Sequence, residues 1–143
     1  MRPRRAVLMK KLFFIVFLLY VNFNAHAQSR VEIHTSICSL VEKGLEMNNH
    51  PVRLKAIFFT DSLEYSNLSD TRCPNAVLIP YYTKSRRHDS GLDTFDNAID
   101  QNDGLPGAVR FSVDVSGTFV WHLEENPHGT IIIEKIWSFK QLH

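Results

Sequence analysis

Two cysteines, Cys38 and Cys73, are the side chains with the widest range of possible chemistry in this sequence. A cysteine pair can form a disulfide, contribute to a metal site or act as a redox couple. The chain has no C-x-x-C motif, which is the usual mark of a redox pair and a frequent part of zinc sites. Which of these readings holds depends on the compartment in which the chain resides.

Histidines and aspartates are the other candidates for metal binding or acid–base chemistry. His122 and His128 lie near each other on one expected hairpin, and imidazole is a common metal ligand. Five aspartates lie between residues 89 and 103, but they lack the alternating spacing, central glycine and terminal glutamate of a calcium-binding EF-hand loop. They are Asp89, Asp93, Asp96, Asp100 and Asp103. We expect dispersed surface histidines, a solvated acidic helix face, no metal site and no cofactor.

The sequence also lacks the common patterns of nucleophilic catalysis. It contains no G-x-S-x-G motif, and no glycine-rich loop of the kind that binds phosphate. An activated serine or cysteine would need a histidine and an acid in support. We therefore expect a protein that is not an enzyme. The alternative is a hydrolase or metal-handling protein that uses His122, His128 and the acids near Asp93.

Aromatic and basic residues that fall in or near the first three expected strands form a possible binding face. Aromatic rings can stack on a ligand while neighbouring cations neutralise its charge. The alternative is that they are ordinary strand-forming aromatics beside a solvated basic turn. The residues of this possible face are Arg53, Lys55, Tyr65, Tyr81, Tyr82 and Lys84.

Seven elements must position these side chains. Apolar residues at three- and four-residue spacing predict helices, and strict alternation predicts strands. The first helix starts with a Thr or Ser that can cap it, and the second begins near Ser90 or Asp93. Ser116-Gly117 indicates a turn or bulge within the fourth strand. The order is helix, three strands, helix, two strands, at 35–47, 51–61, 63–67, 75–82, 90–103, 108–123 and 130–140.

Residues 1–27 have the features of a secretory signal peptide. Lys10 and Lys11 precede an apolar run from residue 12 to residue 23, and Ala25-His26-Ala27 offers a cleavage site. The run is too short to span a bilayer comfortably, so no stable membrane insertion is expected after cleavage. A retained anchor helix is the alternative, and Met1 or Met9 can be the true start. We expect residues 28–143 to form a single periplasmic or secreted domain.

Removing this segment reverses the sign of the charge. Residues 1–27 hold five of the sixteen Lys and Arg residues and none of the fifteen Asp and Glu residues, so residues 28–143 carry a net charge of −4. A basic surface is the electrostatic signature of a nucleic-acid binder. Its absence from the net charge argues against nucleic acid as a partner. In an oxidising compartment, Cys38 and Cys73 most simply form one disulfide.

The sequence resembles uncharacterised exported bacterial OB-fold proteins, which are related to tRNA-anticodon-binding-like barrels. The matching pieces are "ICSLVEKG", "PVRLKAIFF" and "LSDTRCPNAVLIP". The resemblance implies that Cys38 and Cys73 are the disulfide pair of that family and that Asp70 and Pro74 are its loop residues. It implies an architecture and no activity.

Pattern and resemblance together predict a mainly β fold with two short helices. We expect a five-stranded Greek-key OB barrel with an N-terminal helix joined to it by the disulfide. A different small α+β sandwich is the alternative fold. The expected function is that of a non-enzymatic domain of the cell envelope which binds a protein or glycan partner.

Overall fold

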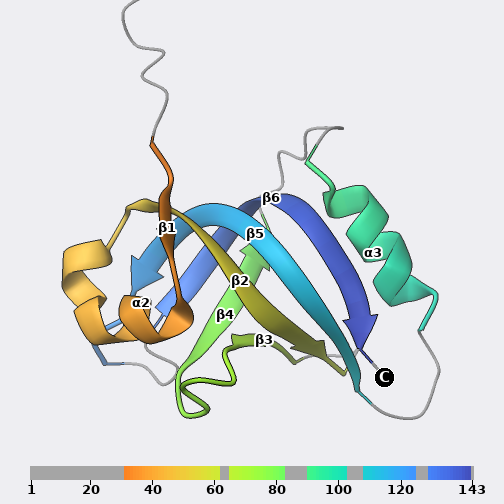
Figure 1. Cartoon of the computed structure of the whole chain (residues 1–143), viewed down its shortest axis with the longest axis horizontal. Coiled ribbons are helices and arrows are strands. Elements are labelled where there is room, and N and C mark those ends of the chain that lie inside the picture. Colours follow the sequence, from red (N-terminus) through yellow and green to blue (C-terminus); the bar gives the residue numbers. More distant parts are fainter. Residues whose placement is uncertain (1–30, 62–64, 83–89, 103–107, 125–128, 143) are drawn as a thin grey trace, which may run out of the picture. The chain divides into compact units, whose positions relative to one another are not determined.

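A mixed six-stranded sheet forms most of the computed structural model (Figure 1). The structure describes residues 31–61, 65–82, 90–102, 108–124 and 129–142. The elements, with η2 a 3-10 helix, are β1 (Ile33–Thr35), α2 (Ile37–Lys43), η2 (Gly44–Met47), β2 (Pro51–Thr60), β3 (Ser66–Ser69), β4 (Val77–Tyr82), α3 (Leu92–Asp100), β5 (Val109–Trp121) and β6 (Gly129–Leu142). The mainly β fold with two short α-helices confirms that part of the sequence-based prediction. The seven predicted elements occur in the predicted order, and β1 adds a sixth strand to the five expected.

The strand pairing connects segments that are distant in sequence. Strands β2, β3 and β4 pair antiparallel in turn, and β4 pairs parallel with β6. Strand β5 pairs antiparallel with both β6 and β2, so β2 has β5 along its whole length. The three-residue β1 pairs parallel with β2. Figure 1 shows β2, β5 and β6 sweeping side by side across the sheet.

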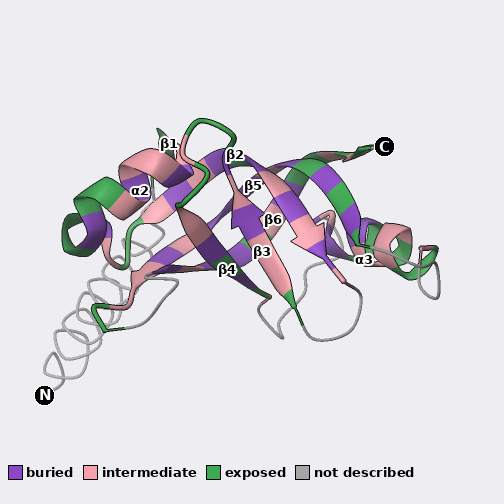
Figure 2. Cartoon of the chain, turned by 90° about the horizontal axis from the view of Figure 1, so that it is seen from below, coloured by how far each residue is buried: buried purple, intermediate pink, exposed green. Residues whose placement is uncertain are grey.

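Alternation of apolar side chains decides which face of each strand is buried. In β2 the buried side chains include Val52, Leu54 and Phe58, while the intervening residues are half-buried or exposed. Strand β5 alternates in the same way except at residues 115–117, which are all buried, and the alternation gives the changing colours along the strands in Figure 2. Successive side chains of a strand point to opposite faces, so this pattern places one face against the core. The opposite face of β2 carries Arg53 and Lys55 outward.

Helix α2 begins where the sequence predicts a cap and is covalently joined to the loop before β4. The Ser36 side chain accepts a hydrogen bond from the Ser39 backbone N–H at 3.2 Å. Cys38, on this helix, forms a disulfide with Cys73, with 5.7 Å between their Cα atoms. The disulfide prediction is therefore confirmed, and the metal and redox readings of this pair are not.

Helix α3 docks through one aromatic side chain. The Phe95 ring is fully buried, and its centroid lies 5.0 Å from that of Phe58 and 5.1 Å from those of Phe111 and Phe139. The edge-on geometry of these pairs is the arrangement that aromatic rings favour. Gly91 precedes the helix at a positive φ of 75°, where a Cβ atom would collide with the backbone carbonyl of Ile136. This close approach sets how the helix enters the core.

Three local features differ from the sequence-based expectation. Strand β1 was not predicted, because its three residues, two exposed and one half-buried, carry no detectable alternation. Strand β3 begins at Ser66, three residues later than predicted, and residues 62–64 lie outside the described part. The turn alternative at Ser116-Gly117 is wrong, because β5 continues through both residues. The bulge alternative is right, since the β5–β6 register shifts there and again after Asp114.

No helix in the described part of the chain is long and apolar enough to cross a membrane.

The candidate site lies along one edge of β2. Strands β1 and β3 both border one edge of β2, and neither covers its middle.

Candidate functional site

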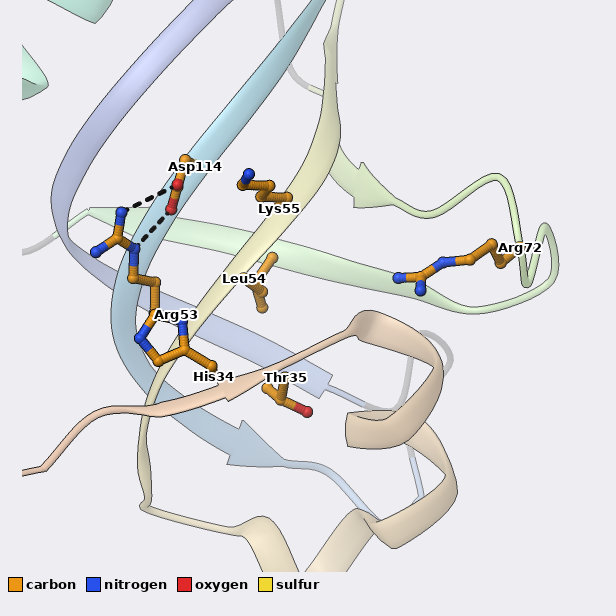
Figure 3. A pocket seen from close by; sticks show the side chains of 7 residues that line it. All are labelled: His34, Thr35, Arg53, Leu54, Lys55, Arg72 and Asp114. Carbon is orange, nitrogen blue, oxygen red and sulfur yellow. Dashed lines mark hydrogen bonds and ion pairs between the residues drawn. The ribbon is translucent and has the colours of Figure 1, made fainter.

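A pocket of about 420 Å³ lies beside the middle of β2, where basic side chains from three parts of the chain converge. Its lining residues are His34, Thr35, Arg53, Leu54, Lys55, Arg72 and Asp114. Figure 3 shows Arg72 extending from the loop between β3 and β4 toward the strands that carry the other side chains. The pocket thus depends on the packing of β1, β2, β5 and this loop.

The pocket lies at a gap in strand pairing. Strand β1 pairs with β2 at Val52–Leu54, and β3 pairs with the same strand only from Ile57 onward. Among the described strands, none pairs with Lys55 or Ala56 on that edge. Strands β1 and β3 therefore leave this part of the β2 edge unpaired, and the Lys55 side chain lines the pocket at this position.

A second pocket, of about 520 Å³, adjoins the first. The two share His34, Thr35 and Arg72. Its remaining lining residues are Ile33, Ser36, Ser39, Lys43 and Met47, from β1, α2 and η2. We refer to the two pockets together as the basic groove.

The basic groove is positive, whereas residues 28–143 as a whole are negative. Lys43, Arg53, Lys55 and Arg72 line it, and Asp114 is the only acid among the described residues that line it. Arg53 is paired with Asp114 and Arg72 with the adjacent Asp70, so Lys43 and Lys55 supply the positive charge that no ion pair among the described residues balances, in a domain whose net charge is −4. Such a concentration of one sign of charge in a concave site attracts ligands of opposite sign.

Arg53 is held in place by a strand-to-strand ion pair. Its Nε and Nη2 atoms donate hydrogen bonds to the two carboxylate oxygens of Asp114, at 2.8 and 3.1 Å (Figure 3). These hydrogen bonds lower the pKa of Asp114 and raise the pKa of Arg53 relative to their ordinary values. The bidentate geometry fixes the guanidinium as a wall of the groove.

Trp137 supports the same guanidinium from β6. The Arg53 Cζ atom lies 4.2 Å from the Trp137 ring centroid, and the Lys135 Nζ atom lies 3.7 Å from it. The indole Nε1–H donates a hydrogen bond of 3.1 Å to the hydroxyl of Ser116, a residue only 2 % exposed. These contacts fix the position of the Trp137 ring. Because Trp137 is 43 % exposed, part of its side chain lies on the surface beside the groove.

Arg72 is positioned by its own loop. The Asp70 carboxylate accepts hydrogen bonds from the backbone N–H, Nε and Nη2 of Arg72, at 3.0, 3.0 and 2.6 Å. The side-chain hydrogen bonds hold the pKa of Asp70 below its ordinary value. Cys73 follows directly and joins this loop to α2 through the disulfide.

Asp70 and Cys73 of this loop, together with Cys38 of α2, form the one group of three potential metal ligands found among the described residues. An Asp70 carboxylate oxygen and the sulfur atoms of Cys38 and Cys73 lie within 4.8 Å of one another. Both sulfurs are committed to the disulfide, and thiolates are the form in which cysteine binds metals. The group therefore serves to hold the loop rather than to bind a metal ion.

Lys43 and Lys55 differ from the two arginines. Both are exposed, and neither forms an ion pair with a carboxylate in the described part of the chain. A ligand can therefore contact these ammonium groups without displacing an internal partner. They are the basic residues of the groove best placed to gain a new anionic contact.

The possible binding face expected from the sequence is divided in the structure. Arg53 and Lys55 line the basic groove. Tyr65 and Tyr81 are 54 % and 56 % exposed but line neither pocket, and the Tyr65 ring packs edge-on against Phe59. The side chain of Tyr82 is half-buried and packs against the core. Lys84 lies outside the described residues.

The alternative set for hydrolysis or metal handling does not form a ligand group among the described residues. A ring nitrogen of His122 lies 3.0 Å from the Thr130 hydroxyl. Asp93, Asp96 and Asp100 lie on α3. His128 lies outside the described part.

Sequence patterns did not identify several residues of the site, namely His34, Lys43, Arg72, Asp114, Lys135 and Trp137. Alternation in β5 does place Asp114 on the outward face, and that signal is visible in the sequence. Its partner Arg53 is 61 residues away, and only the register of β2 on β5 brings them together. Comparison of the chain with protein-family models, with curated proteins and with solved structures found no match in any of the three.

Proposed function

We propose that this protein is an exported, non-enzymatic binding domain that holds an anionic partner of the cell envelope in the basic groove. The observation that carries the proposal is the positive charge of this groove in a domain of net negative charge, because four basic residues line it and only two of them, Arg53 and Arg72, are paired with acids in the described part of the chain. Charge complementarity increases association rates and excludes partners of the wrong sign.

We further propose that the domain is an OB-type barrel of the exported bacterial kind that the sequence resembles. The pairings support this, because β2 pairs with β3, β3 with β4, β4 with β6, β6 with β5, and β5 again with β2. Helix α3 lies between β4 and β5 in the chain, which are the third and fourth of these five strands in sequence order, and this also supports the proposal. OB barrels commonly present binding surfaces on their strands and adjoining loops.

The disulfide supports an oxidising location, where such bonds persist. A periplasmic or secreted protein, released from residues 1–27 by cleavage, follows as part of the proposal. The partner would then be an envelope protein or glycan that carries acidic groups.

The test is an equilibrium binding panel with the exported protein, purified with its disulfide intact. The probes are labelled poly-L-glutamate, polygalacturonate and neutral dextran. The proposal predicts that at least one polyanion binds, that added salt weakens the binding, and that dextran does not bind. If no polyanion binds at low salt, or if dextran binds equally well, the proposal is wrong.

A groove variant with a matched control localises the binding. Lys43→Gln/Lys55→Gln removes two exposed charges from the groove. Glutamine is preferable to glutamate, because residue 55 is the register partner of Asp114. The control, Arg110→Gln/Lys140→Gln, removes two exposed charges that line neither pocket. We expect about fivefold weaker binding for the groove variant and no change for the control.

A further inference from the structure

Building on the proposed function, we infer that the partner binds as an extended acidic polypeptide segment, which adds as a strand to the free edge of β1. The inference specifies the kind of partner and the way it binds. It follows from three properties of the groove: an exposed strand edge, basic side chains beside that edge, and a described lining that contains no Phe, Tyr or Trp.

The strand edge is available at the groove. Among the described strands, β1 pairs with β2 alone, so one edge of β1 has no neighbouring strand. Residues 33–36 line the second pocket consecutively, and no residue of β2 lines it. Strand β1 and the residue that follows it therefore form one wall of this pocket, and Ser39, Lys43, Met47 and Arg72 complete its described lining. An exposed strand edge presents backbone N–H and C=O groups that another strand can pair with.

The basic residues beside this edge select for acidic side chains. Lys43 and Arg72 line the same pocket as β1, and Lys55 lines the adjoining one. In an added strand, every second side chain points to the same face, at a spacing of about 7 Å. A segment with acidic residues at alternate positions can therefore direct several carboxylates to one side while its backbone pairs with β1.

The lining argues for a polypeptide rather than a glycan. No Phe, Tyr or Trp is among the described residues that line the two pockets. The Trp137 ring beside the groove is already in contact with the Arg53 guanidinium and the Lys135 ammonium, and the exposed tyrosines Tyr65 and Tyr81 lie elsewhere. Backbone pairing is available to a polypeptide and not to a polysaccharide, and the groove offers that contact directly.

The test uses fluorescence anisotropy with a short labelled peptide of alternating glutamate and threonine. Two further peptides carry backbone N-methyl groups, one at all glutamates and the other at all threonines. Each keeps every carboxylate but loses the N–H donors along one edge. Strand addition predicts that the parent peptide binds and that one methylated peptide binds at least about tenfold more weakly, as expected for the loss of more than one backbone hydrogen bond.

The outcomes separate this inference from the proposed function. If both methylated peptides bind the groove like the parent peptide, charge alone holds the ligand and strand addition is wrong. If polygalacturonate binds in a way that Lys43→Gln/Lys55→Gln weakens, but the peptide does not bind, the partner is an acidic glycan and only this inference falls. If neither polyanion nor peptide binds, the proposed function falls with it.

Discussion

The two α-helices are attached to the sheet by different means. Helix α3 inserts Phe95 among Phe58, Phe111 and Phe139, so tight aromatic packing holds it. Helix α2 has only seven residues, buries Ile37 and Leu40, and is joined covalently to the β3–β4 loop by the Cys38–Cys73 disulfide. Both helices bury two apolar side chains, Leu92 and Phe95 on α3 and Ile37 and Leu40 on α2, and only α2 adds a covalent bond to this packing.

The difference fits the positions of the two helices. Helix α2 places Ser39 and Lys43 in the lining of the groove, whereas no residue of α3 is among the described residues that line it. The disulfide on α2 also holds the loop that supplies Arg72. The comparison predicts that substitutions in α3 mainly lower stability, whereas substitutions that loosen α2 lower stability and weaken binding together.

Phe95→Ala should have the largest effect on stability. It removes a fully buried ring and leaves a cavity, which costs about 3–5 kcal/mol of unfolding free energy. Denaturant-induced unfolding measures this, and Thr94→Ala on the exposed side of the same helix is the control. A loss below about 1 kcal/mol would show that α3 contributes little to the core.

Loss of the disulfide should rank next. The two cysteines are separated by 35 positions, and Cys38→Ala/Cys73→Ala releases a loop of that size in the unfolded chain, which costs about 3–4 kcal/mol. The variant should also bind polyanions more weakly even where it remains folded, because Arg72 is then held only by its loop. Chemical reduction of the wild type is the control and should match it. Unchanged binding by a folded variant would contradict the role given to the bond.

Trp137→Phe should have a smaller effect. It removes the indole N–H and leaves the buried Ser116 hydroxyl without that donor, at a cost of about 0.5–1.5 kcal/mol. Tyr81→Phe, which removes a donor from an exposed ring, should change stability much less. Equal losses in the two variants, measured by thermal unfolding, would argue against an ordered Trp137.

The smallest effect should be the pH dependence that Asp70 contributes. Its pKa in the folded protein is lowered by Arg72, so the contact stabilises the folded state at pH values above the unfolded pKa of about 3.9. That contribution is lost as the pH falls from there through the lowered folded value. Asp70→Asn should therefore be less stable than wild type at neutral pH and should approach it in strong acid. A constant difference across this range would contradict the assignment.

Local sequence patterns were sufficient to predict much of the fold. Alternation in β2 and β5 predicts their buried faces, and three- and four-residue spacing predicts both helices. The disulfide was predicted from the expected signal peptide together with the presence of just two cysteines. Strand β1 escaped prediction because its attachment comes from pairing with β2 rather than from its own residues.

The candidate site was less predictable because it is assembled from distant residues. Arg53 and Lys55 stand out as outward-facing bases on a strand. Asp114, Trp137 and Arg72 reach them only through strand register, two bulged positions in the β5–β6 pair, and the disulfide-linked loop. Tyr65 and Tyr81 looked like partners of these bases because aromatic residues near cations suggest a ligand face. Their nearness to the bases in the sequence was misleading, because neither tyrosine lines the groove.

The central claim is that the basic groove binds the partner. Its most direct test is a two-dimensional NMR titration of the protein, purified with its disulfide intact, with the alternating glutamate–threonine peptide, following every assigned backbone amide. The account predicts the largest shift changes at residues 33–36, 43, 55 and 72, with little change at Tyr65 and Tyr81. Shift changes centred on Tyr65 and Tyr81, with residues 33–36 unaffected, would contradict it.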